Sequence, residues 1–274
     1  MELELKKECL DTYELGEPQT LTQEETAETI VPDYCPDIAR IISAEGVVCL
    51  HGGTEQDGVT GTVRVTVLYT PENESGVRAL EFAMPFSAQG EGLAGCAHVV
   101  VETEIELLES RMLNPRKIFT RCKLVTHLAG CRKVCLTISS DAETDPALLV
   151  EKRCCGQTVS LLRQVAEKDL TFSETMSLSL GREGAAELLH CRANGIVTET
   201  KAIGNKLIFK GVFLVSALYR TIGGQLASAS AELPFSQIME TDSTEENTQV
   251  SMRLRITGTD IQIEGSDDAG RQLS

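Results

Sequence analysis

Thiol groups are the side chains of this sequence best suited to covalent chemistry. Ten cysteines are present, and Cys35 stands between Asp33-Tyr34 and Pro36-Asp37, while Cys154 is adjacent to Cys155. A Pro-Asp pair is typical of a helix N-terminus, and that position lowers a thiol pKa. The flanking carboxylates oppose thiolate formation, however. A thiol-dependent redox protein or enzyme that uses Cys35 or the Cys154/Cys155 pair is therefore kept as the alternative hypothesis.

The remaining reactive side chains form no recognisable catalytic pattern. Cys96-Ala97-His98 and His190-Cys191 place a thiol near an imidazole in sequence, but neither pair belongs to a known motif. The cysteine spacings match no zinc pattern, and the glycine-rich segments lack the lysine of a phosphate-binding loop. Glu102, Glu104 and Glu106 alternate as on the solvent face of a strand. We therefore expect no enzyme activity, no catalytic residue, no cofactor and no bound metal.

The net charge of -16 constrains the partners of this chain. Such a surface repels phosphate backbones and anionic lipid, which argues against nucleic acid as a partner. The N-terminus is charged from Glu2 onward, and no apolar run approaches the ~20 residues of a membrane span, so we expect neither a signal peptide nor membrane insertion. A cytoplasmic location follows, in which most cysteines act as small apolar residues and a few cross-link only in an oxidising assembly.

The strongest pattern in the sequence is an internal repeat. The segment 61–69, GTVRVTVLY, returns at 211–219 as GVFLVSALY, and each copy is followed by Pro-Phe-Ser, at 85–87 and 234–236. The first copy alternates apolar and polar residues, which is typical of a β-strand with one buried face. A repeat of this kind predicts two related β modules.

These elements predict a mainly β fold of two tandem sandwich-like modules. Residues 1–145 form the first module and residues 146–274 the second, with the Asp141–Pro146 stretch as linker. We expect one short helix in each module, at 36–42 and at 183–190, because an early proline and acidic residues suit a helix start.

The second copy raises a further expectation. It reaches Ser274 about where the first copy reaches Val125, so the second module looks truncated at its C-terminus and lacks counterparts of the later strands. An incomplete sheet exposes unpaired backbone groups. We therefore expect the second module to pair with another chain or to be less stable than the first.

Two kinds of segment are candidates for protein contacts. One is the basic island Asn114-Pro115-Arg116-Lys117, whose simpler interpretation is a turn in which proline fixes φ. The other is the pair of Pro-Phe-Ser segments with Pro85, Phe86, Pro234 and Phe235. Their simpler interpretation is packing, with both phenylalanines in the core and both prolines on edge strands.

Several of these stretches together resemble a known family. The segments 27–38 (AETIVPDYCPDI), 111–117 (RMLNPRK), 203–212 (IGNKLIFKGV) and 232–240 (ELPFSQIME) are similar to those of SipL-like spore coat morphogenetic proteins. The resemblance implies a repeated spore-coat domain of endospore-forming Firmicutes. It also implies a cytosolic scaffold of the mother cell that acts at the forespore surface beside the coat ATPase SpoIVA. Family members usually carry a C-terminal LysM module, which we do not recognise here.

The sequence therefore predicts a non-enzymatic scaffold or adapter in spore coat assembly. It would bind spore coat proteins through exposed loops and sheet edges, which also suit self-association. A peptidoglycan- or glycan-binding module is a further alternative, against which the absence of tryptophan counts.

Overall fold

A computed structural model describes residues 4–51, 58–143, 151, 153, 156, 158–177, 184–242, 248–264 and 272–273. The mainly β prediction is confirmed, because every regular element in this described part is a strand. The strands before residue 144 are β1 (Glu4–Leu15), β2 (Gln19–Ile30), β3 (Ile38–His51), β4 (Gly58–Pro71), β5 (Arg78–Gln89), β6 (His98–Asn114) and β7 (Lys117–Glu143). The later ones are β8 (Met176–Ser177), β9 (Ala185–Ile203), β10 (Lys206–Thr221), β11 (Leu226–Glu240), β12 (Ile263–Glu264) and β13 (Gln272–Leu273).

Two antiparallel sheets enclose the core of the first module. One has the order β3-β4-β5, and the other places the first half of β7 between β2 and β6. Both sheets show the alternation of buried and exposed residues expected when one face is covered. The core draws on both layers, and its most buried members include Val63, Val65, Val67, Ile118 and Leu124.

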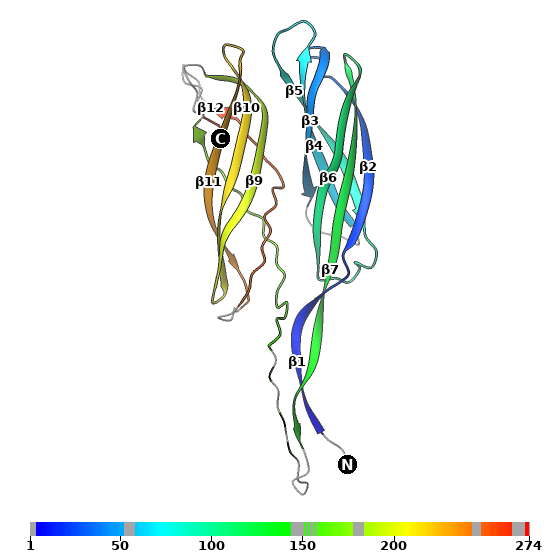
Figure 1. Ribbon diagram of the computed structural model, residues 1–274, viewed down its shortest axis with the longest axis vertical. Coiled ribbons are helices and arrows are strands. Elements are labelled where there is room, and N and C mark those ends of the chain that lie inside the picture. Colours follow the sequence, from blue (N-terminus) through cyan, green and yellow to red (C-terminus); the bar gives the residue numbers. More distant parts are fainter. Residues whose placement is uncertain are drawn as a thin grey trace.

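The second half of β7 leaves this core and pairs with β1. The register runs from Leu15 opposite Cys131 to Glu4 opposite Glu143, with a disulfide between Cys9 and Cys135. Figure 1 shows this two-stranded ribbon projecting away from the sheets toward the N-terminus. One continuous strand therefore serves both the core and the ribbon.

The predicted repeat appears in three dimensions as two matching sheets. The sheet β9-β10-β11 has the same antiparallel order as β3-β4-β5. In each sheet a phenylalanine lies opposite a glycine of the middle strand, Phe86 opposite Gly61 and Phe235 opposite Gly211. A Cβ atom on either glycine would lie 2.5 Å from the phenylalanine ring, so only glycine leaves room for the ring.

The two predicted helices are wrong, and β-bulges explain the error. β3 begins at Ile38 and β9 at Ala185, which places strands where the helices were expected. The register of β3 shifts twice near its start, and that of β9 shifts twice in the corresponding place. Each bulge adds a residue and turns an apolar spacing of two into three, which imitates a helical period.

The layer that faces β9-β10-β11 is built differently from its counterpart in the first module. The segments 158–175 and 248–262 are extended but belong to no ladder among the described residues, and only β8, β13 and β12 form a short sheet. Phe172 contacts the ring of Phe213, and Leu254 reaches Gly195 of β9 much as Ile105 reaches Gly46 of β3. The two segments therefore occupy the places that β2 and β6 occupy in the first module.

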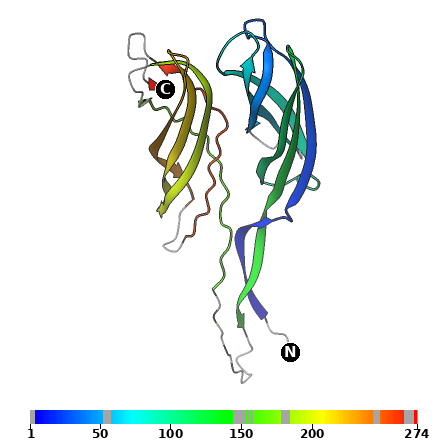
Figure 2. The ribbon, with the colours of Figure 1, turned by 45° about the horizontal axis from the view of Figure 1, so that its top comes forward.

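These two segments also join the modules. Figures 1 and 2 show them running between the β9-β10-β11 sheet and the first module. The Tyr13 amide donates to the Leu162 carbonyl at 2.8 Å, and Arg255 donates to the Val101 carbonyl at 3.2 Å. Arg253 pairs with Glu102 at 2.5 Å. The contacts are polar, and those of Arg253 and Arg255 are exposed, as in interfaces between domains of one chain.

Candidate interaction site

The β2–β3 loop and the β6–β7 turn meet at one end of the first module. Pro115 fixes φ in the turn, and the Asn114 side chain accepts a hydrogen bond from the Arg116 amide at 2.9 Å. The Val31 amide donates to the Arg116 carbonyl, and the Ile38 amide donates to the Pro115 carbonyl, both at 2.9 Å. Two of the stretches that carry the family resemblance therefore lie against each other.

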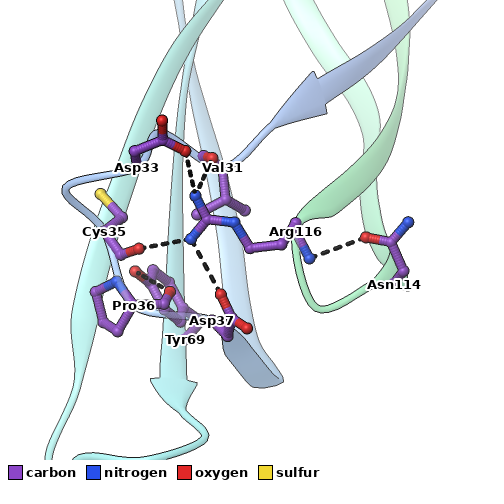
Figure 3. Close-up of polar contacts among 8 residues, drawn as sticks. All are labelled: Val31, Asp33, Cys35, Pro36, Asp37, Tyr69, Asn114 and Arg116. Atoms are coloured by element: carbon purple, nitrogen blue, oxygen red, sulfur yellow. Dashed lines mark hydrogen bonds and ion pairs between the residues drawn. The ribbon is translucent and has the colours of Figure 1, made fainter.

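The Arg116 guanidinium group holds the β2–β3 loop from within (Figure 3). Its Nη1 donates to the Cys35 carbonyl at 2.7 Å and to Asp37 at 3.0 Å. Its Nη2 donates to the Val31 carbonyl at 2.9 Å and to Asp33 at 3.1 Å. A planar guanidinium group can donate hydrogen bonds to four acceptors at once, whereas an ammonium group cannot. We call this arrangement the Arg116 clamp.

Tyr69 supports the clamp from the core side. Its hydroxyl donates to the Pro36 carbonyl at 3.3 Å, and its side chain is fully buried. Burial, and secondarily the neighbouring Cys35 thiol, raise the pKa of Tyr69 to about 12. The Glu72 amide also donates to the Asp37 carbonyl at 2.9 Å. The loop is therefore tied to β4 as well as to the β6–β7 turn.

The outer side of the clamped loop presents an exposed aromatic residue. The Tyr34 side chain is 88% exposed, and the apolar side chains of Ile30 and Leu113 are exposed near the same end of the sheet. A rigidly held loop lowers the entropy cost of contact, and tyrosine is enriched at the centres of protein interfaces. The arrangement therefore presents an exposed aromatic ring on a loop held by several hydrogen bonds.

The basic residues predicted for contact are largely engaged within the molecule. Arg116 forms the clamp, and Lys117 pairs with Glu28 at 2.5 Å. The contact role of the Asn114–Lys117 turn stays a prediction, but the structure assigns Arg116 a positioning role. Sequence reasoning missed Tyr34, although a large aromatic residue between Pro32 and Pro36 is an unusual loop composition that could have indicated it.

The Pro-Phe-Ser segments are found in the strands β5 and β11. Phe86 and Phe235 are buried over their glycine partners, while Pro85 and Pro234 are exposed. β5 and β11 are the outer strands of their sheets, where proline costs no ladder hydrogen bond. These positions fit the packing interpretation of the two segments, and a contact role for them stays a prediction.

The Cys35 thiol does not lie at a helix N-terminus. Cys35 lies in the clamped loop before β3, so the helix N-terminus that was expected to activate it is absent. Burial raises the pKa values of Cys122 and Cys191 to about 11, which keeps both thiols protonated at neutral pH. Cys154 and Cys155 lie outside the described residues. Within the described ranges, no cluster of three or more potential ligand residues could hold a metal ion.

The fold defines the class of this protein. Its described part is all-β and contains two copies of a three-stranded sheet, each faced by extended segments. Residues 185–264 match the family model described as SipL, SPOCS domain, and this match supports a SipL-like family assignment. The match spans β9 to β12, which is the second copy of the repeat. No curated protein and no solved structure matches the chain. The SPOCS domain indicates a role related to sporulation.

None of the described elements is a helix with the length and hydropathy needed to cross a membrane.

Proposed function

We propose that this protein is a non-enzymatic scaffold or adapter of endospore coat assembly. It works in the mother cell cytoplasm at the forespore surface, where it joins coat proteins, among them the coat ATPase SpoIVA. The single observation that carries the proposal is the SPOCS match at residues 185–264, because it ties the repeated β module to sporulation.

The architecture supports an assembly role. The β1–β7 ribbon and the β3-β4-β5 and β9-β10-β11 sheets present several strand edges. Such edges bind extended segments of other proteins through backbone hydrogen bonds. The Arg116 clamp adds a rigid loop with an exposed tyrosine. A protein with several separate contact surfaces can hold more than one partner.

Localisation in sporulating cells tests the proposal. A fluorescent fusion of the chain, produced in an endospore-forming clostridial host, is expected to form a ring around the forespore and to co-purify with SpoIVA. The matched control is the fluorescent protein alone, produced from the same promoter. An even distribution through the mother cell, with no coat protein recovered on purification, would contradict the proposed role.

The clamped loop can be tested in the same cells. Tyr34→Ala removes the exposed ring but no contact of the Arg116 clamp, so the protein should fold while co-purification with coat proteins decreases. Thr198→Ala provides a control at an exposed position of β9, away from the loop. Equal recovery of coat proteins with both variants would exclude Tyr34 as a contact residue.

A further inference from the structure

The β1–β7 ribbon carries an exposed disulfide bond. Cys9 of β1 is bonded to Cys135 of β7, and both residues are exposed. Free cysteines elsewhere in the first module differ from this pair, because Cys49, Cys122 and Cys131 are buried. An attacking thiolate must reach a disulfide sulfur, and exposed disulfides exchange with small thiols more readily than buried ones. The ribbon disulfide is therefore accessible to thiol–disulfide exchange.

The outer part of the ribbon has almost no buried surface. Of residues 5–11 and 135–143, only Leu10 and Ala142 are partly buried, and all the others are exposed. Within the described ranges, β1 pairs with β7 alone. A two-stranded ribbon without a core is marginally stable in water. The covalent bond between the strands is therefore expected to decide whether this outer part stays ordered.

The root of the ribbon is held by packing and by a neighbouring segment. The side chain of Thr12 is buried, and its hydroxyl donates to the Leu162 carbonyl at 3.0 Å. The Tyr13 amide donates to the same carbonyl, and the Tyr13 ring lies 5.9 Å from the ring of His98. Cys131, at the inner end of the ladder, is buried. Opening of the ribbon should therefore stop at Thr12 and leave the core of the first module folded.

We propose that the Cys9–Cys135 disulfide is a site of reversible exchange with low-molecular-weight thiols, and that its redox state controls the order of the outer ribbon. A small thiolate attacks one sulfur and forms a mixed disulfide, while the other cysteine leaves as a thiolate. A second small thiolate attacks the small-molecule sulfur of the mixed disulfide and releases the second cysteine. Two small thiols thus become one small disulfide, and the protein gains two electrons and two protons.

The two redox states differ in the edge that β7 presents. With the bond intact, residues 135–143 are paired with β1, whereas after opening their backbone donors and acceptors on that side have no partner strand. A reducing cytoplasm keeps exposed disulfides open. That last step rests on the cytoplasmic location proposed above, but the exchange reaction does not. Its tests need no spore, so the two proposals can be rejected independently.

Peptide mass spectrometry tests the exchange on the full chain, purified without reductant. The probe is reduced glutathione at millimolar concentration, and iodoacetamide blocks free thiols before digestion. We expect the bridged Cys9–Cys135 peptide to decrease at least tenfold, with a transient glutathione adduct, and to return with oxidised glutathione. Cys96→Ser is the matched control, because it removes a free thiol beside Gly130 and should change the rate less than twofold. A purified chain without the bridge, or a bridge that persists in glutathione, would overturn the proposal.

Hydrogen exchange tests the structural response. Amides of residues 5–11 should exchange at least tenfold faster in the reduced chain than in the oxidised chain. Residues 19–30, which pair with the first half of β7, serve as the internal control and should not change. The variant Cys9→Ser/Cys135→Ser should exchange like the reduced chain, whichever form of glutathione is present. Equal protection of residues 5–11 in both redox states would mean that the ladder alone orders the ribbon, and the proposed control would be rejected.

Discussion

At the scale of single residues, the Arg116 side chain makes four hydrogen bonds to one loop of the first module. Its guanidinium group satisfies the carbonyl groups of Val31 and Cys35 and two loop carboxylates, while only a third of the side chain is exposed. A buried carbonyl without a donor costs free energy, so one side chain determines whether the β2–β3 loop keeps its shape.

Replacement of Arg116 should loosen that loop. Arg116→Ala leaves two carbonyl groups without donors, so we expect a loss of about 1–3 kcal/mol in the free energy of unfolding. Arg116→Lys should recover only part of the loss, because an ammonium group cannot reach all four acceptors. Urea unfolding measures both variants. The control is Arg111→Ala, whose guanidinium stacks on Phe119 at 4.8 Å and whose loss should cost under about 1 kcal/mol. If Arg111→Ala and Arg116→Ala lowered the free energy of unfolding equally, the result would contradict the stabilising role given to the Arg116 clamp.

Tyr69 should make the protein sensitive to alkali. Its pKa is about 12 in the folded protein and about 10 in the unfolded chain, so the stability conferred by the neutral phenol is complete below pH 10. That stability is lost as the pH rises from 10 to 12, by about 3 kcal/mol in total. Urea midpoints measured from pH 9 to 11.5 test the slope. Tyr69→Phe should flatten it, and an unchanged slope in that variant would rule out Tyr69 as the cause.

At the scale of the elements, the two matching sheets depend on close approach at their glycines. A Cβ atom on Gly61 would lie 2.5 Å from the Phe86 ring and 2.9 Å from the Cys49 carbonyl oxygen. On Gly211 it would meet the Phe235 ring at 2.5 Å and the Ile196 carbonyl oxygen as well. The two sheets therefore share one packing constraint.

Alanine at either glycine should destabilise the protein. Gly61→Ala and Gly211→Ala force a ring and a backbone carbonyl apart, so each should cost about 1–3 kcal/mol in thermal or urea unfolding. Gly258→Ala is the control, because a Cβ there meets nothing within 4 Å and should change stability by less than about 0.5 kcal/mol. Adding Phe86→Leu to Gly61→Ala should restore part of the loss. A Gly61→Ala variant as stable as Gly258→Ala would show that the sheet relaxes freely.

The same elements show how far the sequence alone could predict this fold. The alternation of Val63, Val65 and Val67 and the repeated Pro-Phe-Ser located the strands and the duplication correctly. Bulges near Ile38 and Ala185 misled the helix prediction, because a bulge changes the local period without changing the strand. The partners of Arg116 lie about 80 residues away in sequence, and no local pattern specifies such a contact.

At the scale of the whole molecule, several of the contacts between the modules are exposed and polar. Arg64 donates to the Thr259 carbonyl at 2.9 Å, and Arg255 bridges the Val101 carbonyl and Glu167. Exposed pairs of this kind contribute little stability each, typically below ~1 kcal/mol. We therefore expect them to affect the relative placement of the modules more than the stability of either one.

Removing the contacts of Arg253 and Arg255 should change the shape of the molecule more than its stability. In Arg253→Ala/Arg255→Ala we expect the unfolding free energy to fall by about 1 kcal/mol or less, while small-angle X-ray scattering reports a larger radius of gyration. The control is Arg121→Ala, which removes a partly exposed pair with Glu24 inside the first module and should leave the radius unchanged. An unaltered radius in the double variant would mean that other contacts align the modules.

The continuity of β7 determines how the molecule responds to a pulling force. Its first half is the central strand of a sheet and its second half forms the ribbon with β1, so a single backbone connects the ribbon tip to the core. A load pulling on that tip is transmitted along β7 and strains the hydrogen bonds to β2 and β6 in shear. In shear, many of these hydrogen bonds bear the load at the same time rather than opening one after another.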